Sequence, residues 1–328
     1  MSRRALITGI GGQDGSFLAE LLLDRGYEVF GIVRRPTSER YPNLDGVRDQ
    51  VHLMQADLLD ELSLVDALKT ADPHEVYNLA APSFVPMSWK QPVLTAEFAA
   101  VGATALLEAV RLVAPDARVY QAASSEIFGE PIEAPQTEET PVMPLTPYGV
   151  AKAYSFFIVR SYRRRYDLHA SCGILYNHES PRRPVDFLPR KVANGTARIA
   201  AGLDDVLVLG DLDARRDWGF AGDYVDAMWR MLQQDEADDY VIATGVTHSV
   251  QDLVECAFDY VGLDWRAHVR VDESLRRGRA ELHNLVGNPA KARERLAWTP
   301  TVDFATLVRT LVAADVAALA TPERTAEP

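Results

Sequence analysis

Tyr148 and Lys152 lie four residues apart, and Ser124 and Glu126 precede them in the chain. Residues four apart share one face of a helix. A phenol ordinarily loses its proton near pH 10, and a cation within reach lowers its pKa by about 1–3 units. We therefore expect Tyr148 to accept a proton from a substrate hydroxyl at neutral pH, with Glu126 as a separate acid or base. Two proton-transfer groups predict chemistry beyond simple alcohol oxidation.

A strand and a helix must position these side chains. The apolar run 117–122 predicts a strand that ends just before the Ser-Ser-Glu segment. Thr146 is a favoured N-cap residue and Pro147 a favoured first helical residue, so a helix is expected over about 148–166. Two plainer interpretations stay open, because Tyr–Lys pairs are common on exposed helices and Glu126 could merely cap a turn.

Strand-like and helix-like segments alternate through the first half of the chain. This rhythm predicts an α/β fold, a doubly wound parallel sheet of the Rossmann type with helices on both faces. The expected strands are 5–8, 28–33, 51–55, 76–79, 117–122 and 169–175, and the expected helices include 17–25, 62–69, 93–113 and 148–166.

The regular alternation is lost after Leu175. Residues 177–190 are rich in Pro and Arg and predict a long ordered loop. A chain of 328 residues exceeds the size of one growing core, so about two lobes are expected. Beyond the loop we expect helices at 191–201, 222–233 and 250–261, strands at 206–209 and 240–243, and a frayed tail after Thr321.

Composition narrows the class of protein. The net charge of −13 and pI of about 5.0 argue against nucleic acid or an anionic membrane as the main partner. Cys172 and Cys256 stand apart without a Cys/His cluster, which favours free thiols in a reducing cytoplasm. No uncharged apolar run approaches ~20 residues, so no membrane span is expected. His178 has no partner at ligand spacing, and we expect no metal site.

A glycine-rich segment follows the first expected strand and opens the first expected helix. Glycines there let the backbone turn tightly and approach a pyrophosphate at the helix N-terminus. In this context the pattern predicts dinucleotide binding, although alone it is weak. The residues concerned are Gly9, Gly11, Gly12, Gln13, Asp14 and Gly15.

Other strand ends should complete this dinucleotide site. Arg34 and Arg35 follow the second strand, where an arginine favours the 2′-phosphate of NADP, and a solvated basic loop is the alternative. Asp57 and Leu58 should border the adenine, unless they serve ordinary strand-end packing. The segment expected beneath the cofactor contains Leu79, Ala80, Ala81 and Ser83, with Leu94 from the next helix.

The chain resembles the GDP-mannose 4,6-dehydratase family, within the extended short-chain dehydrogenases/reductases. The Asn-His-Glu-Ser-Pro and Arg-Asp-Trp-Gly segments distinguish that family from other sugar-nucleotide enzymes. The resemblance covers nearly the whole chain and is carried by LITGIGGQDG (6–15), EVYNLAA (75–81), SSE (124–126), YGVAK (148–152), GILYNHESPRR (173–183), DARRDWG (213–219), DYVIATG (239–245) and GNPAKA (287–292).

The resemblance implies a reaction and a role for each residue. Tyr148, helped by Lys152, would take the hydroxyl proton while hydride leaves carbon 4 of the mannose for NADP+. Glu126 would remove the carbon 5 proton and protonate the hydroxyl that leaves carbon 6, and Ser124 would hydrogen-bond the sugar. Hydride would then return to carbon 6, so no net redox change is expected.

The resemblance also implies ligand contacts and assembly. His178 and Arg183 would border the cofactor, and the alternative for His178 is a packed loop histidine. Family members form dimers or tetramers, so a homodimer or homotetramer is expected. Residues 1–176 plus about 217–247 would bind NADP, and about 177–216 plus 248–328 would bind the sugar nucleotide. The implied contacts to the GDP-sugar are Ser83, Ser125, Asn177, Lys191, Arg216 and Arg279.

Some positions depart from the family pattern. Ser124 stands where threonine is usual, Pro82 replaces glutamine, and Pro184 replaces glycine. A dehydratase of another GDP-sugar, such as a GDP-heptose, is therefore an alternative. A GDP-sugar reductase or epimerase is a second one, and a non-catalytic cofactor-binding sensor is a third. Glu126 discriminates against a reductase, which needs no base for carbon 5.

Overall fold

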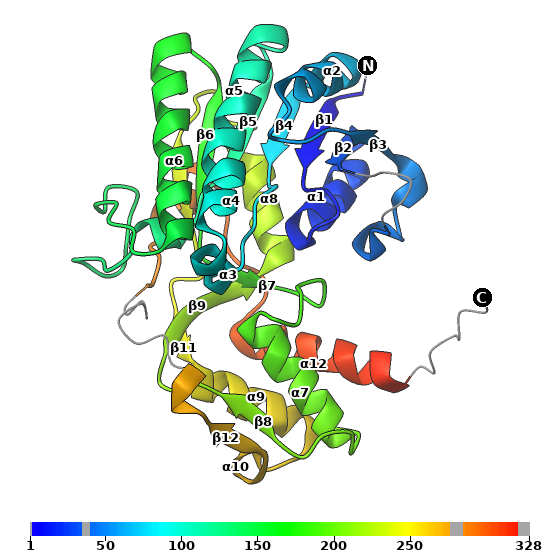
Figure 1. The fold of residues 1–328 in the computed structure, drawn as a ribbon, viewed down its shortest axis with the longest axis vertical. Helices are drawn as coiled ribbons and strands as arrows, with labels where there is room; N and C mark the ends of the chain where they lie inside the picture. The colour runs from blue at the N-terminus through cyan, green and yellow to red at the C-terminus, as the bar shows by residue number, and fades with distance from the viewer. Residues whose placement is uncertain (1, 35–39, 276–284, 321–328) are drawn as a thin grey trace.

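A seven-stranded sheet forms the centre of the upper part of the molecule (Figure 1). The computed structural model describes residues 2–34, 40–275 and 285–320, so Arg35, Arg279 and the expected frayed tail lie outside it. All neighbouring strands of this sheet pair in parallel, which confirms the expected doubly wound architecture. In sheet order the strands are β10 (Asp239–Ile242), β6 (Ala170–Leu175), β5 (Arg118–Ala122), β4 (Glu75–Asn78), β1 (Arg4–Thr8), β2 (Glu28–Val33) and β3 (Val51–Gln55).

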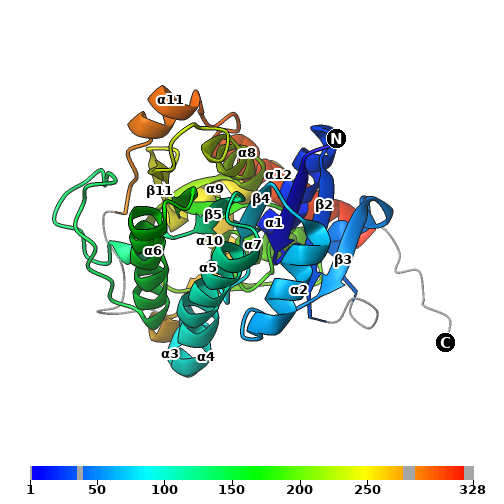
Figure 2. The ribbon, with the colours of Figure 1, turned by 90° about the horizontal axis from the view of Figure 1, so that it is seen from above.

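Helices cover both faces of the sheet, as Figure 2 shows from above. Each face carries its own apolar cluster, because strands buried on both sides alternate their side chains between two layers. One face is covered by α2 (Glu61–Ala71), α5 (Gly102–Val113) and α6 (Pro147–Tyr166), and the other by α1 (Gln13–Asp24), α8 (Ala221–Met231) and α11 (Ala290–Leu296).

A third apolar cluster lies in the lower part of Figure 1. It is built from α7 (Leu188–Ala200), α9 (Val250–Val261) and α12 (Phe304–Ala320), with the parallel pair β8 (Leu207–Leu209) and β12 (Val269–Val271). A three-stranded sheet of β7 (Asn177–Glu179), β9 (Arg215–Phe220) and β11 (Thr247–Ser249) lies between this cluster and the large sheet. The remaining short elements are α3 (Val85–Lys90), α4 (Pro92–Ala96), α10 (Trp265–His268), a π-helical turn (Glu97–Val101) and 3₁₀ turns at Pro42–Leu44, Arg48–Gln50, Ser125–Ile127 and Glu273–Leu275.

Two expected elements differ in the structure. The expected loop 177–190 begins as strand β7 and ends inside helix α7, which starts at Leu188. The expected helix 93–113 contains the π-helical turn between α4 and α5. Elements that the sequence did not reveal are β7, β9, β11, β12, α3, α10, α11 and α12.

The stretch Pro92–Val113 is long and apolar enough to cross a membrane by length and composition, with a mean hydropathy of 1.6. In the fold, Leu106, Leu107 and Val110 of this stretch lie in the apolar cluster beneath α2 and α6. We therefore interpret it as a core helix of the sheet layer.

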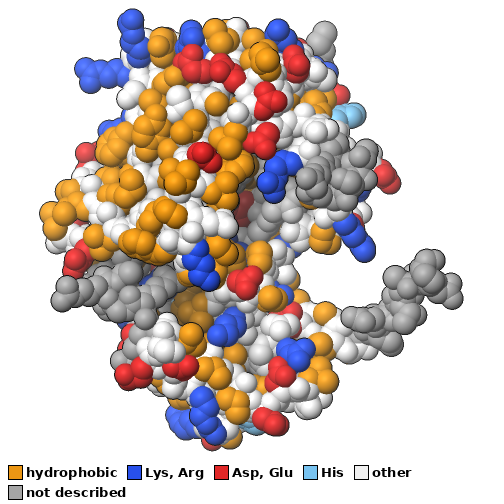
Figure 3. Space-filling view, viewed as in Figure 1, with side chains coloured by type: hydrophobic (Ala, Val, Ile, Leu, Met, Phe, Trp, Pro, Cys, Tyr) orange, Lys and Arg blue, Asp and Glu red, His pale blue; other side chains and the backbone are white. Residues whose placement is uncertain are grey.

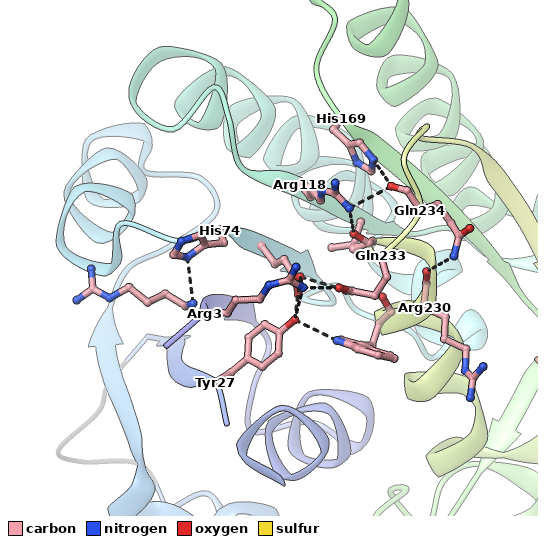
Figure 4. Close-up of polar contacts among 12 residues, drawn as sticks. Arg3, Tyr27, His74, Arg118, His169, Arg230, Gln233 and Gln234 are labelled. Carbon is pink, nitrogen blue, oxygen red and sulfur yellow. Dashed lines mark hydrogen bonds and ion pairs between the residues drawn. The ribbon is translucent and has the colours of Figure 1, made fainter. Parts of the chain in front are cut away.

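A buried polar network ties the amino end of the sheet to the end of α8 (Figure 4). Glu75 is 2% exposed and accepts hydrogen bonds from the hydroxyls of Tyr27 (3.0 Å) and Tyr77 (2.7 Å) and from Gln233 Nε2 (3.1 Å). Arg118 donates to the carbonyls that follow α8, at Leu232 and Gln234. The backbone carbonyl groups at the end of α8, which have no partner within the helix, therefore accept hydrogen bonds from a side chain of the sheet.

Candidate active site

A cleft of about 1000 Å³ opens at the carboxyl ends of β1, β4 and β5, above the lower apolar cluster. In open parallel sheets this edge is where ligands bind. Every site residue expected from the sequence that the structure describes lines this cleft. They are Gly9, Gly11, Gly12, Gln13, Asp14, Gly15, Arg34, Asp57, Leu58, Leu79, Ala80, Ala81, Ser83, Leu94, Ser124, Ser125, Glu126, Tyr148, Lys152, Asn177, His178, Arg183, Lys191 and Arg216.

The glycine segment forms a tight cradle between β1 and α1. Gly9 has φ of +71°, a conformation that favours glycine. A Cβ on Gly15 would lie 2.3 Å from the carbonyl oxygen of Gly9, so a larger residue would displace the turn. The cradle leads into the N-terminus of α1, whose free amides and dipole fit the diphosphate of a dinucleotide.

A neighbouring loop covers the cradle and was not identified from the sequence. Asn43 Nδ2 donates to the carbonyl oxygen of Gly11 over 3.2 Å, and the Tyr41 ring lies where a Cβ on Gly11 would fall. Both side chains line the cleft. No motif marks them, because this contact depends on how the chain returns to the glycine segment.

Strand β7 is tied to the cradle by a buried ion pair. His178 Nε2 lies 2.8 Å from Asp14 Oδ2, and Gln13 bonds both to the carbonyl oxygen of His178 and to the Ser180 hydroxyl. Burial favours the neutral carboxyl, but the His178 cation holds the pKa of Asp14 at about 2. Burial likewise opposes the imidazolium, yet Asp14 raises the pKa of His178 above its usual value. Both pKa shifts favour the ionised form of the pair.

A row of polar side chains lies beneath the cleft. The Thr8 hydroxyl donates to Asn78 Oδ1 (2.7 Å), and Asn78 Nδ2 donates to Gln121 Oε1 (2.7 Å). Thr8 and Asn78 end β1 and β4, and Gln121 is the last but one residue of the adjacent β5, so the register of the sheet sets their spacing. Lys152 Nζ donates to the carbonyl oxygen of Ala122 over 2.8 Å at the end of β5. This bond fixes the ammonium group against the cleft.

Burial governs the ionisation of the Tyr148–Lys152 pair. Removal from water raises the pKa of Tyr148 to about 12, although hydrogen bonding with Ser124 acts to lower it. The expectation that Lys152 depresses this pKa was wrong for the protein alone, because desolvation outweighs a cation 5.8 Å from the ring centroid. Burial also lowers the pKa of Lys152 to about 8.

Glu126 stands on the 3₁₀ turn that follows β5. Ser124 caps this turn by accepting from the amide of Glu126 (3.3 Å), so the Glu126 side chain is not itself the cap. The Thr146 hydroxyl donates to Glu126 Oε2 over 3.2 Å and accepts from the amide of Gly149. A Cβ on Gly149 would lie 2.5 Å from the Glu126 carbonyl oxygen, so glycine lets α6 approach the turn. The sequence identified Thr146 only as a helix cap.

The lower end of the cleft carries polar and cationic groups. Lys191 Nζ donates to the carbonyl oxygen of Val208 (2.8 Å), and Arg216 donates to that of Arg215 (2.7 Å). Asn177 begins β7, which pairs in parallel with β9. At the opposite end, Arg34 is exposed at the end of β2. The cleft therefore has cations at both ends.

This arrangement places a phenol, an ammonium, a hydroxyl and a carboxylate on one wall of a cleft that starts at a helix N-terminus. The phenol and the carboxylate can transfer protons at two different atoms of one ligand. The cradle can hold a diphosphate beside them.

Comparisons with known proteins agree with this arrangement. The sequence model of the family described as GDP-mannose 4,6 dehydratase matches residues 6–311. GDP-mannose 4,6 dehydratase 1 of Arabidopsis thaliana is 46% identical over 324 residues, which cover 95% of this chain and 89% of that protein. The GDP-mannose 4,6 dehydratase of Homo sapiens is 44% identical over 339 residues, covering 95% and 91%.

Among solved structures, the UDP-glucose 4-epimerase of Thermus thermophilus in complex with NAD superposes with a TM-score of 0.81 at 28% identity. The superposition covers 95% of this chain and 98% of that one. Both kinds of match span nearly the whole chain, and this protein therefore belongs to the GDP-mannose 4,6-dehydratase family, with the Rossmann-type fold of the extended short-chain dehydrogenases/reductases.

Proposed function

We propose that this enzyme removes water from GDP-mannose and forms GDP-4-dehydro-6-deoxy-mannose. The observation that carries the proposal is the position of two proton-transfer groups, Tyr148 and Glu126, in one cleft with the glycine cradle. Family membership supports it, because the relatives matched along the chain are named for this reaction.

The side chains divide the reaction between them. Tyr148 takes the proton of the carbon 4 hydroxyl, Lys152 stabilises the phenolate, and Ser124 hydrogen-bonds the same hydroxyl. Glu126 removes the proton from carbon 5, which the carbon 4 ketone has made acidic, and returns a proton to the hydroxyl that leaves carbon 6 as water. A bound nicotinamide supplies a reversible hydride acceptor, so it is regenerated in each turnover.

NADP is the cofactor we propose, supported by Arg34 at the end of β2, where a cation suits a 2′-phosphate. The rest of its site would be lined by Asp57, Leu58, Leu79, Ala80, Ala81, Ser83, Leu94, His178 and Arg183.

Arg34→Ser should weaken binding of NADP+ and leave that of NAD+ within about twofold, since only NADP carries the extra charge. Equal weakening of both dinucleotides would refute the assignment.

The GDP-sugar would occupy the other end of the cleft, with Ser83, Ser125, Asn177, Lys191 and Arg216 as its contacts. We propose that residues 1–176 with about 217–247 bind the dinucleotide, and about 177–216 with 248–328 bind the sugar nucleotide. Arg279, also expected there, lies outside the described residues.

Mass spectrometry tests the reaction directly. The purified protein is incubated with GDP-mannose without added NADPH, and the expected product is lighter by one water. Tyr148→Phe should abolish product, and a parallel incubation with a GDP-heptose tests the alternative sugar. If the protein only reduces a 4-keto sugar, and only when NADPH is added, the lyase assignment fails.

A homodimer or homotetramer is the assembly we propose. Figure 3 shows apolar side chains gathered over α4, α5 and α6. Val101, in the π-helical turn between α4 and α5, is 58% exposed, and Phe157 of α6 is 50% exposed. An apolar area of this kind favours burial against a second copy.

Replacing Val101 and Phe157 together with glutamate should give monomers in light scattering. Leu62→Glu, at an exposed apolar position on α2, should leave the assembly unchanged.

The cytoplasm is the location we propose. Its support is the pair of free cysteines, Cys172 and Cys256.

A further inference from the structure

Glu179 is a buried carboxylate on the wall of the cleft that the proposed reaction does not use. Its side chain is 1% exposed, and its Oε2 atom accepts no hydrogen bond from any described residue. Burying a charged or polar group without a hydrogen-bond partner costs free energy. A group that is nevertheless buried in this way calls for an explanation, such as a role in binding a ligand. Burial raises the pKa of Glu179, while the nearby Arg183 acts to lower it.

Arg183 is the cation that faces this carboxylate. Its Nε atom lies 3.5 Å from Glu179 Oε2 and is itself buried without a hydrogen bond. The guanidinium carbon lies 3.8 Å from the centroid of the Phe187 ring, which covers one face of the group. The guanidinium turns the edge that carries Nε toward Glu179 and lays one flat face on Phe187. Its terminal nitrogens are therefore the donors that remain for a ligand in the cleft.

The main chain of Arg183 is also held in place. Its amide donates to the carbonyl oxygen of Ser180 (3.1 Å), and its carbonyl accepts from Arg190 Nε (3.2 Å). A long cationic side chain loses conformational entropy when it binds an anion, and such restraints reduce that loss. The backbone bonds fix where the side chain starts, and the contacts with Phe187 and Glu179 restrain its guanidinium before a ligand binds.

The position of Arg183 indicates the class of ligand. Its charge acts to lower the pKa of Asp14, in the glycine cradle, and that of Tyr148. Ser180, whose carbonyl oxygen accepts from the Arg183 amide, donates its hydroxyl to Gln13 of the cradle over 2.8 Å, so the segment that carries Arg183 lies on the dinucleotide side of the cleft. A planar fork of donors suits the oxygens of a phosphate.

We propose that Glu179 is a positioning residue, which holds the guanidinium of Arg183 so that its terminal nitrogens bind a phosphate of the dinucleotide. Glu179 itself touches no ligand in this assignment. The identity of the ligand rests on the proposed function, whereas the coupling between Glu179 and Arg183 does not.

A double-mutant cycle tests the coupling. Glu179→Gln keeps the shape and removes the charge, Arg183→Met removes the cation, and the double variant combines them. Dissociation constants for NADP+ and for GDP are measured by calorimetry on the full-length protein freed of bound nucleotide. Glu20→Gln is the control, because Glu20 forms a shorter and more exposed ion pair with the adjacent Arg182 (2.6 Å) and does not line the cleft.

For a positioning role, Glu179→Gln should weaken NADP+ binding about tenfold and GDP binding less than about twofold. In the Arg183→Met background the same change should have no further effect, and Glu20→Gln should resemble the parent protein. If Glu179→Gln fails to fold, Glu179→Asp should show a smaller loss in the same direction.

Two results would overturn the proposal. One is a loss of NADP+ affinity that persists when Arg183 is already methionine, and the other is an equal loss of GDP affinity. Failure of the parent protein to bind any dinucleotide would instead refute the proposed function, so the two failures are distinguishable.

Discussion

The Thr146 hydroxyl performs two tasks at the start of α6. It caps the helix by accepting from the amide of Gly149, and it donates to the Glu126 carboxylate. One hydroxyl can do both because it has one proton and two lone pairs. The same atom thus links the helix that carries Tyr148 to the turn that carries Glu126.

Thr146→Val should therefore harm both stability and catalysis. Loss of the cap should lower the free energy of unfolding by about 1 kcal/mol. A less ordered Glu126 should lower kcat roughly tenfold with KM little changed, because a positioned group is lost in the transition state. Urea unfolding and steady-state kinetics measure the two effects. Thr146→Ser should restore both, and failure of serine to rescue would show that the methyl group matters instead.

The buried ammonium of Lys152 gives the stability a distinctive pH dependence. Its pKa is about 8 in the folded protein and 10.5 ordinarily. Between these values the unfolded chain binds more protons than the folded one, so the free energy of unfolding rises with pH across this window. The depressed pKa corresponds to a total change of about 3 kcal/mol.

The Lys152→Met variant should lack this rise of the unfolding free energy with pH. The difference in unfolding free energy between methionine variant and parent should be constant below pH 8 and shrink by up to about 3 kcal/mol towards pH 10.5. Urea unfolding at several pH values measures it. Parallel curves for the two proteins would show that Lys152 is not responsible.

The sequence was sufficient to place the chemically distinctive residues. Tyr148, Lys152, Ser124 and Glu126 follow local signals, a strand end and a capped helix start, and the fold brings them into one cleft. The pKa of Tyr148 was predicted in the wrong direction, because desolvation depends on packing that spacing does not reveal. Glu179 was missed for the same reason.

Individual elements were predictable where their patterns were strong. The strands of the large sheet are apolar runs between turn residues, and the structure confirms each of them within a residue or two. Strands β7 and β9 were missed because Asn-His-Glu and Arg-Arg-Asp-Trp-Gly-Phe lack an alternating pattern. Strand β9 is held instead by tertiary bonds, such as those from Thr244 and Gly245 to the buried Asp217 carboxylate.

The network around Glu75 should dominate the attachment of α8 to the sheet (Figure 4). Glu75→Ala removes four hydrogen bonds, the longest of them the 3.5 Å bond from Arg3, and leaves buried donors unpaired, so the free energy of unfolding should fall by about 3 kcal/mol. Dinucleotide affinity should be unchanged, because this end of the sheet faces away from the cleft. Urea unfolding measures the change. Glu236→Ala, at an exposed site beyond α8, should alter stability by less than about 0.5 kcal/mol, and an equal loss there would contradict the network's role.

On the scale of the whole molecule, the C-terminal helix α12 is connected to the cleft through one buried ion pair. Asp315 of α12 binds Arg190 of α7 in a two-point contact, with one bond of 2.8 Å between Nη2 and Oδ1. Arg190 in turn donates to the carbonyl oxygen of Arg183. The sequence did not predict this connection, because α12 was not recognised as a helix and its partner lies 125 residues away.

Asp315→Ala should destabilise the fold by about 3–5 kcal/mol, because it leaves the Arg190 guanidinium buried without its counter-charge. Arg190→Met combined with Asp315→Leu should recover most of that stability, since apolar side chains of similar volume often replace a buried ion pair without loss. The double variant should still bind NADP+ several-fold more weakly, because the bond to the carbonyl of Arg183 is gone. Urea unfolding and calorimetry separate these effects. If the double variant is as unstable as Asp315→Ala, the shape of the two side chains rather than their charge holds the helices together. If it binds NADP+ as tightly as the parent protein, α12 does not act on the cleft.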